Sequence, residues 1–185
     1  QMSDLYAVFG NPIAHSKSPA IHAAFAAEAG QDMIYEARIA AVDGFNQAIS
    51  EFVAAGGKGA NVTVPFKEDA FRLATRLSDR AARAGAVNTL AFNGAEIFGD
   101  NTDGAGLVRD ISQNLGFSLA GKRVLLLGAG GASRGVIAPL LAEKPFSLFI
   151  ANRSADKANA LAESFSDIAA VNAGNFAKTE GMKFD

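Results

Sequence analysis

Residues 122–135 read KRVLLLGAGGASRG, an apolar run that leads into a glycine-rich turn and then into a helical pattern. Gly128 permits a tight turn, and Gly130 and Gly131 let backbone N–H groups come close to a pyrophosphate. The helix that follows offers its positive N-terminus to the same anion. This pattern is typical of redox enzymes with a soluble nicotinamide cofactor, although Ser133 replaces the third glycine of the usual spacing. A plain strand–turn–helix junction is the alternative interpretation.

A second apolar run ends in polar and basic residues that favour one cofactor over another. Residues 147–154 read SLFIANRS, and Lys157 follows one helical turn later. An NAD-binding unit usually carries Asp or Glu at this position, to accept a hydrogen bond from the ribose 2′-hydroxyl. Asn152, Arg153 and Ser154 instead suit a 2′-phosphate, so the sequence predicts NADP. The alternative is that Arg153 and Lys157 belong to a solvated helix face.

Small polar residues gather within residues 1–103, at the ends of expected strands and in loops. An open α/β sheet binds its ligand at such places. Hydroxyl and amide groups suit a small polyhydroxylated ligand, and two serines could donate to its carboxylate. Ser18 and Asp103 could instead only cap helices, and Asn88 could only order a turn. The candidates are Ser16, Ser18, Asn61, Thr63, Lys67, Asn88, Thr102 and Asp103.

The elements that must position these residues follow a β-α-β-α-β order in the first half of the chain. Apolar runs at 5–9, 33–39 and 59–64 are the expected strands, and Asn93-Gly94 is the turn region of a later hairpin. The order predicts a mostly parallel sheet with an antiparallel edge. Helical spacing places four phenylalanines in the core: Phe25, Phe45, Phe52 and Phe71.

The fold class predicted is therefore α/β with two domains. Residues 1–103 form a mostly parallel α/β substrate domain. Residues 104–185 form a partial Rossmann-type domain, opened by a helix over about 104–115 and a buried strand at 122–127.

Composition excludes several classes of function. A net charge of −2 and a pI near 5.7 argue against a broad surface for nucleic acid or anionic membranes. No apolar run reaches membrane-spanning length and no secretory signal opens the chain, so the expected location is the cytoplasm. With no cysteine and two histidines, we expect no disulfide, no thiol catalysis and no metal site.

Six motifs, in this order, closely resemble those of the shikimate dehydrogenases. They read VFGNPIAHSKSP (8–19), NVTVPFK (61–67), AGAVNT (84–89), GDNTDG (99–104), GAGGASRG (128–135) and NRS (152–154). The family interconverts 3-dehydroshikimate and shikimate with NADP, on the route to chorismate and the aromatic amino acids. The resemblance implies an N-terminal substrate domain, a C-terminal NADP domain and an active site between them.

The resemblance also implies roles for individual residues. Ser16 and Ser18 would bind the substrate carboxylate, and Lys67 and Asp103 would form the catalytic pair. Asp79 would lie near the cofactor. The ring hydroxyls would be bound by Asn61, Thr63, Asn88 and Asp103. The pyrophosphate would be bound by Gly128, Ala129, Gly130, Gly131 and Ala132. The adenosine ribose and its 2′-phosphate would be bound by Asn152, Arg153, Ser154 and Lys157. The family frequently has Arg where Lys157 stands, and Lys offers a point charge instead of a bidentate fork.

Family members continue beyond this sequence with further strands, a tyrosine-bearing loop and a glutamine-bearing helix. We therefore expect a truncated enzyme, and three functions stay open. The chain is a part of a shikimate dehydrogenase, a related enzyme that accepts quinate, or a non-catalytic ligand-binding fragment that forms a homodimer. The pair Ser16 and Ser18 favours shikimate over quinate.

Overall fold

The structure is a computed structural model, in which residues 3–185 are described. It divides into two compact units, with the boundary between Asn101 and Thr102. The boundary expected from the sequence, after Asp103, lies two residues further along the chain. Each unit has its own sheet, so each is described by itself. Within residues 3–185, no helix combines the length and the apolar character needed to cross a membrane.

The first unit contains one six-stranded sheet and four helices. The strands are β1 (Asp4–Gly10), β2 (Met33–Ile39), β3 (Gly57–Val62), β4 (Arg76–Leu77), β5 (Thr89–Asn93) and β6 (Glu96–Asp100). The helices are α1 (Ser18–Ala29), α2 (Phe45–Ala54), α3 (Lys67–Leu73) and α4 (Asp79–Ala84).

The sheet has the strand order β2-β1-β3-β5-β6-β4. β1 pairs in parallel with β2 and β3, β4 pairs in parallel with β6, and β5 runs antiparallel to both β3 and β6. The prediction of a mostly parallel sheet is confirmed, but the predicted antiparallel edge is wrong. The antiparallel strand lies inside the sheet because the hairpin returns beside β3, and β2 and β4 form the edges.

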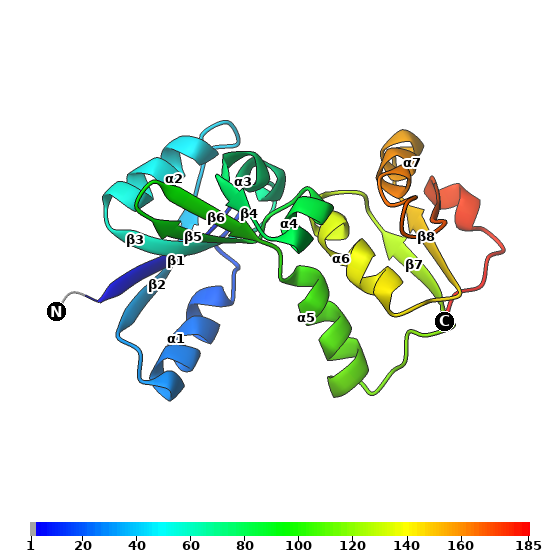
Figure 1. Cartoon of the computed structure of the whole chain (residues 1–185), viewed down its shortest axis with the longest axis horizontal. Helices are drawn as coiled ribbons and strands as arrows, with labels where there is room; N and C mark the ends of the chain where they lie inside the picture. Colours follow the sequence, from blue (N-terminus) through cyan, green and yellow to red (C-terminus); the bar gives the residue numbers. More distant parts are fainter. Residues whose placement is uncertain (1–2) are drawn as a thin grey trace. The chain divides into compact units, whose positions relative to one another are not determined.

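Helices α2 and α3 cover one face of this sheet (Figure 1). Phe45, Ile49 and Phe52 recur at helical spacing along α2 and are all buried. The Phe52 ring meets that of Phe9 from β1 edge to face, with centroids 5.4 Å apart. Phe66 stacks on Phe45 at 5.0 Å. Each such burial contributes roughly 1.5–3 kcal/mol, so this aromatic core holds α2 and α3 to the strands.

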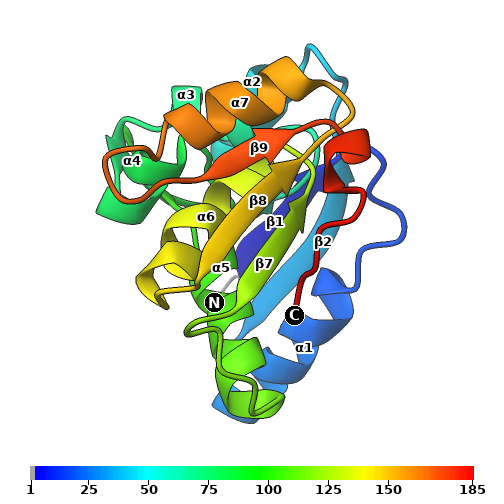
Figure 2. The same cartoon turned by 90° about the vertical axis from the view of Figure 1, so that its right-hand side faces the viewer.

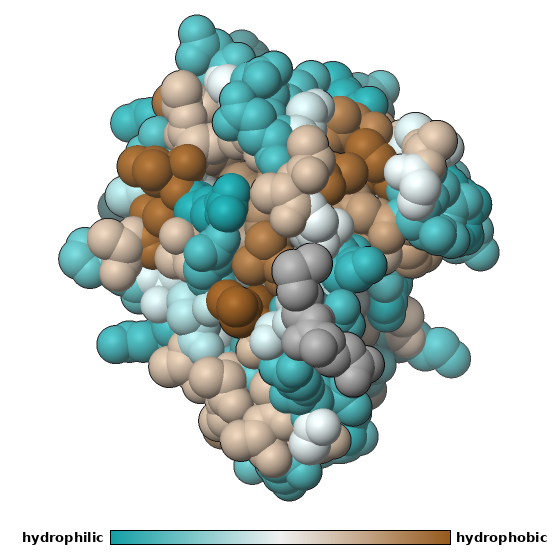
Figure 3. Space-filling model, turned by 90° about the vertical axis from the view of Figure 1, so that its left-hand side faces the viewer, coloured by the Kyte–Doolittle hydropathy of each residue, from teal (hydrophilic) through white to brown (hydrophobic). Residues whose placement is uncertain are grey.

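Helix α1 lies on the opposite face and is far less buried (Figure 1). His22 and Ala26, one turn apart, lie toward the sheet, so Phe25 falls outside this stripe and is 59% exposed. The predicted core position of Phe25 is therefore wrong, whereas Phe45 and Phe52 are buried as predicted and Phe71 is half-buried. On the face drawn in Figure 3, hydrophobic surface is broken into separate areas by hydrophilic residues.

The second unit contains a three-stranded parallel sheet, ordered β7-β8-β9 (Figure 2). A buried cluster that includes Ile137, Ile150, Leu161 and Phe165 forms its main core. The strands are β7 (Arg123–Leu127), β8 (Ser147–Ala151) and β9 (Asn172–Gly174). The helices are α5 (Asp103–Arg109), the π-helical turn η1 (Asp110–Asn114), α6 (Gly131–Ala142), α7 (Ala155–Glu163) and the 3₁₀ turn η2 (Phe176–Thr179).

Strand β7 is less buried than its sequence predicts. The prediction of a buried strand is wrong, because β7 pairs only with β8 among the described strands and forms the edge of the sheet. Its residues are half-buried, and Leu127 at its end is 65% exposed. β8, in the middle of the sheet, is buried from Leu148 onward.

Candidate functional site

The directions of the strands bring several of the candidate substrate residues together at one end of the strands of the first sheet, called the polar end below. The carboxyl ends of β1 and β3 meet the amino end of β5 there, because β5 runs the opposite way. The register pairs Val8 with Asn61, Asn61 with Thr89, and Thr89 with Asp100. An interior antiparallel strand therefore adds Asn88 and Thr89 to a site that an all-parallel order would not have placed together.

The side chains at the polar end of the sheet are joined by hydrogen bonds. The Tyr35 hydroxyl donates to Asn61 Oδ1 at 2.6 Å, and Asn61 Nδ2 donates to Thr89 Oγ1 at 3.3 Å. The Thr89 hydroxyl in turn donates to Asn88 Oδ1 at 2.9 Å. Asn88 is only 8% exposed. The amides of Asn61 and Asn88 are thus fixed in orientation before any ligand binds.

The backbone of Asn88 also joins neighbouring segments. Its carbonyl accepts from the Val62 N–H at 2.8 Å, and its own N–H donates to the Asp100 carbonyl at 3.0 Å. These bonds join Asn88 to the ends of β3 and β6 and close no turn, and its side chain belongs to the hydrogen-bonded group of Asn61 and Thr89.

Lys67 and Thr63 lie where β3 leads into α3. Lys67 is the first residue of α3, is half-buried, and its carbonyl accepts from the Val87 N–H at 2.8 Å. Thr63 donates its N–H to Phe9 at 2.9 Å and accepts from Phe66 at 3.0 Å. The lysine is therefore held against the segment that contains Asn88.

Ser16 and Ser18 lie at the start of α1. Lys17 is the N-cap residue and makes no side-chain cap, and Ser18 is already helical, so the cap role considered for Ser18 is wrong. Ser16 Oγ accepts from the Ser18 N–H at 3.2 Å. A hydroxyl that accepts one bond still has a proton to donate, which suits contact with a carboxylate.

Asp100, which was not among the sequence-predicted residues, holds neighbouring segments together at the polar end of the sheet. Its carboxylate accepts from Arg80 Nε at 2.7 Å, from Ser78 Oγ at 2.6 Å and from the Asn101 N–H at 2.7 Å. These bonds, that of Arg80 above all, lower the pKa of Asp100 to about 2. Asn101 Nδ2 then donates to the Ala86 carbonyl at 3.0 Å. The available signal was its place in the motif at 99–104, where Asp100 is one of two acidic residues.

Two predicted residues fall in units other than those of their expected partners. Asp103 begins α5 in the second unit, and Thr102 is its N-cap residue, so the cap role considered for Asp103 is wrong. Asp79 begins α4 in the first unit, whereas the other cofactor candidates belong to the second. The pairing of Lys67 with Asp103, and the contact of Asp79 with a cofactor, stay predictions.

A pocket of about 420 Å³ in the second unit gathers most of the cofactor candidates. Arg153 and Lys157 at this pocket are exposed, and Phe176 of η2, which the sequence analysis missed, is 50% exposed. β9, which precedes η2, was not predicted, so no signal marked Phe176 beforehand. The lining residues are Ala129, Gly130, Asn152, Arg153, Ser154, Lys157 and Phe176.

The glycine loop has the geometry that a dinucleotide requires. Gly128 has φ +106°, a conformation that side chains disfavour, and its N–H donates to the Ala151 carbonyl at 2.8 Å. A Cβ added at Gly130 would meet nothing within 4 Å, so the backbone there faces open space. Helix α6 begins at Gly131, which places Gly131 and Ala132 in its first turn although neither lines the pocket. Open backbone beside exposed cations fits a dinucleotide with an extra phosphate.

The second apolar run ends as a fixed turn. Asn152 Nδ2 donates to the Ser154 carbonyl at 3.0 Å, and its backbone N–H donates to Gly174 at 3.0 Å. Ser154 is the N-cap of α7, with Oγ accepting from the Lys157 N–H at 3.4 Å. Lys157 is thus held one turn from Arg153. Residues 3–185 contain no group of three acidic or histidine side chains that could hold a metal ion.

Comparison with known proteins places these features in a family. A model described as the shikimate dehydrogenase substrate binding domain matches residues 8–90, and one described as shikimate / quinate 5-dehydrogenase matches residues 109–180. A shikimate dehydrogenase (NADP(+)) from Dechloromonas aromatica is 79% identical over 184 residues, covering 100% of this chain and 67% of that protein. The chain thus spans about two thirds of the length of this curated relative.

Solved structures agree with the sequence matches. The Ael1 enzyme from Pseudomonas putida is 47% identical with a TM-score of 0.86, covering 99% of this chain and 67% of that one. Shikimate 5-dehydrogenase from Thermus thermophilus, solved in complex with NADP(H) and shikimate, is 36% identical with a TM-score of 0.81, covering 92% and 62%. The chain therefore belongs to the shikimate dehydrogenase family.

Proposed function

We propose that this chain carries the substrate and cofactor sites for the reversible, NADPH-dependent reduction of 3-dehydroshikimate to shikimate. The observation that carries the proposal is the pocket at Arg153 and Lys157, where open glycine backbone and two exposed cations suit a 2′-phosphorylated dinucleotide. Relatives named for this activity match the chain throughout. The first unit supplies a group of hydrogen-bonded polar side chains that suits a ligand with several hydroxyl groups.

The roles on the substrate side follow from the groups available. Ser16 keeps a hydroxyl proton that can be donated to the substrate carboxylate, and Ser18 stands two residues away. The oriented amides of Asn61 and Asn88 provide donors and acceptors for ring hydroxyls. Thr63 adds a hydroxyl at the end of β3.

The proton transfer is assigned to Lys67. NADPH, when bound, supplies the hydride that reduces the carbonyl carbon. The Lys67 ammonium gives a proton to the carbonyl oxygen in that direction, and the neutral amine takes it back in the reverse direction. Asp103 orients the lysine and the substrate hydroxyl. Oxidation of shikimate reverses both transfers, so the same lysine serves both directions of the reaction.

The cofactor roles are divided between backbone and side chains. The residues from Gly128 to Ala132 bind the pyrophosphate through their N–H groups and the start of α6. Arg153 contacts the 2′-phosphate through its planar guanidinium, and Lys157 adds a point charge. Asn152 and Ser154 hold the ribose. Phe176 supplies an apolar wall of the same pocket.

The test is the formation of NADPH by this chain from shikimate and NADP, with NAD and quinate in parallel. We expect shikimate-dependent turnover that prefers NADP. Turnover with quinate at a similar rate would favour the broader enzyme, which the family description of residues 109–180 includes. A folded chain without turnover that still binds shikimate and NADP would be a ligand-binding portion of such an enzyme. Elution from a sizing column at several concentrations tests the homodimer of that last alternative, which a purely monomeric elution would rule out.

A further inference from the structure

The Tyr35 hydroxyl contacts a residue that we expect to bind the substrate. It donates to Asn61 Oδ1 at 2.6 Å. Tyr35 belongs to β2 and Asn61 to β3, so this bond links the side chains of two strands. We infer that Tyr35 is a positioning residue that holds Asn61 in its ligand-binding arrangement, an inference that rests on the function proposed above.

The hydrogen bonds run in one direction from Tyr35 across the sheet. Tyr35 donates to Asn61, Asn61 donates to Thr89, and Thr89 donates to Asn88. Because Tyr35 occupies the amide oxygen of Asn61, the amide nitrogen is turned toward β5. Without the phenol proton, the Asn61 amide keeps only the longer contacts of its nitrogen, to Thr89 Oγ1 at 3.3 Å and to the Asn88 carbonyl at 3.4 Å. The bond from Tyr35 is therefore the shortest of the contacts that orient the Asn61 amide.

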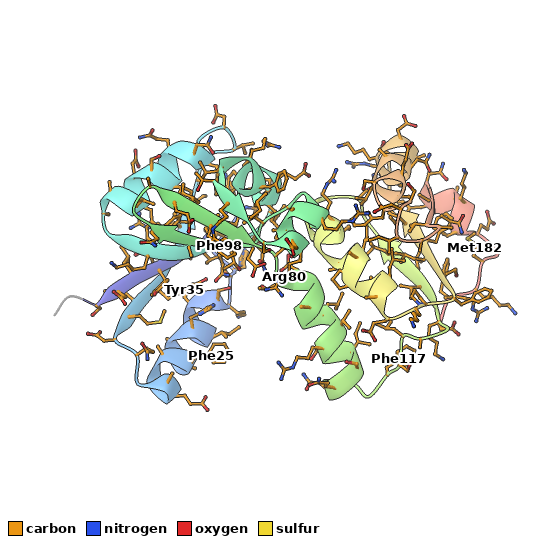
Figure 4. All side chains as sticks on the ribbon, viewed as in Figure 1. Phe25, Tyr35, Arg80, Phe98, Phe117 and Met182 are labelled. Atoms are coloured by element: carbon orange, nitrogen blue, oxygen red, sulfur yellow. The ribbon has the colours of Figure 1, made fainter. Side chains whose placement is uncertain are left out.

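The ring of Tyr35 is itself held in place. His22 of α1 stacks on it, with centroids 4.1 Å apart and planes within 3°. Figure 4 shows Tyr35 on β2, on the side of the sheet where α1 lies. Burial lowers the pKa of His22, which favours the neutral imidazole in this stack. A phenol fixed by stacking presents its hydroxyl in one position and loses little freedom when it forms a hydrogen bond.

The phenol remains a donor near neutral pH. Burial raises the pKa of Tyr35 to about 12, and the nearby Ser18 side chain acts in the opposite direction. Loss of the proton, which would remove the bond to Asn61 Oδ1, therefore does not occur near neutral pH.

Tyr6 provides a matched control on the neighbouring strand. β1 and β2 place Tyr6 directly beside Tyr35, and both line one cavity of about 480 Å³ together with His22 and Asn61. Among the described residues, none forms a hydrogen bond with the Tyr6 side chain. Tyr6→Phe and Tyr35→Phe each remove one hydroxyl from the same face, but only Tyr35→Phe removes a bond to Asn61.

The experiment measures shikimate binding to the whole chain by calorimetry, for the wild type, Tyr35→Phe, Tyr6→Phe, Asn61→Ala and the Tyr35→Phe/Asn61→Ala double variant. Loss of one neutral hydrogen bond predicts that Tyr35→Phe weakens binding about 3- to 10-fold, with Tyr6→Phe within about 2-fold of wild type. In the Asn61→Ala background, Tyr35→Phe adds no more than about a 2-fold loss, because the residue through which it acts is absent. An equal loss in both backgrounds, or no loss in the wild-type background, overturns the inference.

A second readout is independent of substrate. The side-chain amide signals of Asn61 in ¹⁵N-labelled protein shift and broaden in Tyr35→Phe and stay in place in Tyr6→Phe. If the wild-type chain binds no shikimate, the proposed function fails for this chain, and the Asn61 signals still decide whether Tyr35 fixes the amide. Unchanged Asn61 signals in Tyr35→Phe would overturn the inference even if shikimate binds. Thermal melts confirm that each variant is folded.

Discussion

The two candidate sites differ in how much of their hydrogen bonding is complete before a ligand arrives. In the first unit, Asn61, Thr89 and Asn88 already bond to one another, and Tyr35 holds the end of the series. In the second unit, the pocket is formed by open glycine backbone and by the exposed side chains of Arg153 and Lys157. One site is preorganised by side chains, and the other by the path of the backbone.

This difference follows from the packing beneath each site. The aromatic core between the six-stranded sheet and α2 and α3 fixes the strands whose ends form the first site. Such rigidity suits the recognition of hydroxyl positions on a small ring, where a displacement of one ångström loses a hydrogen bond. A phosphate is instead held by charge and by N–H groups, which tolerate mobile side chains. Four predictions test this contrast.

The largest effect is expected from Lys67→Ala. Removal of a general acid–base group lowers turnover by about two to four orders of magnitude, while the dissociation constant for shikimate changes little. Steady-state rates and calorimetry measure the two quantities separately. Lys58→Ala, an exposed lysine of the same unit, is the control and keeps wild-type turnover. A loss of tenfold or less in Lys67→Ala would remove Lys67 from the mechanism.

On the cofactor side, Arg153→Ala is expected to raise the dissociation constant for NADP about 10- to 100-fold, because charge-assisted hydrogen bonds to the 2′-phosphate are lost. The affinity for NAD, which lacks that phosphate, changes much less. Fluorescence titration with both cofactors measures the ratio. Arg109→Ala, an exposed arginine of α5, should leave both constants unchanged. Equal weakening of NAD and NADP would show that Arg153 does not read the phosphate.

The packing of the second unit depends on a close approach of α5 and α6. A Cβ at Gly104 would stand 2.3 Å from the Gly135 carbonyl oxygen and 2.5 Å from Pro139. We expect Gly104→Ala to lower the free energy of unfolding by about 1–3 kcal/mol. Gly106→Ala, on the same helix with nothing within 4 Å, should raise it by about 0.5–1 kcal/mol. Urea denaturation of both variants tests the sign, and destabilisation by both would contradict the packing argument.

The smallest effect concerns acid stability of the first unit. The pKa of Asp100 is lowered to about 2, chiefly by Arg80, so its contribution to stability is present above its ordinary pKa of 3.8 and is lost as the pH falls toward 2. Asp100→Asn should cost on the order of 1–2 kcal/mol at pH 7, and the difference from wild type should shrink toward pH 2. Asp69→Asn, which breaks the exposed pair with Arg72, is the control and costs less than about 0.5 kcal/mol. A constant difference across pH would contradict this account.

The sequence predicted the regular elements because their signals are local. Phe45 and Phe52 lie on the buried face of α2, as their helical spacing predicts. The glycine loop was likewise predicted from its spacing. Errors arose where burial depends on neighbours distant in sequence. Phe25 is exposed because α1 turns His22 and Ala26 toward the sheet, and β7 is half-buried because it lies at an edge.

The residues missed at the candidate sites have the same origin. Nothing in the alternating pattern of β2 distinguishes Tyr35, because its importance comes from the register that places Asn61 within reach. Asp100 becomes significant only when Arg80 and Ser78 fold back on it. Phe176 depends on β9, whose three residues are too few to give a periodic signal. Local sequence patterns predict elements, whereas partners across a sheet require its topology.

The exposed side of β7 also has a consequence for handling the protein. At its start the backbone of β7 is bonded to Asp185 through Arg123, but the rest of this edge strand offers donors and acceptors to another strand, and the exposed Leu127 at its end favours such contact. We therefore expect concentrated preparations to lose material through strand-to-strand aggregation. Natural edge strands carry lysine at such positions as a gatekeeper against aggregation, and Leu127→Lys would give this sheet the same protection.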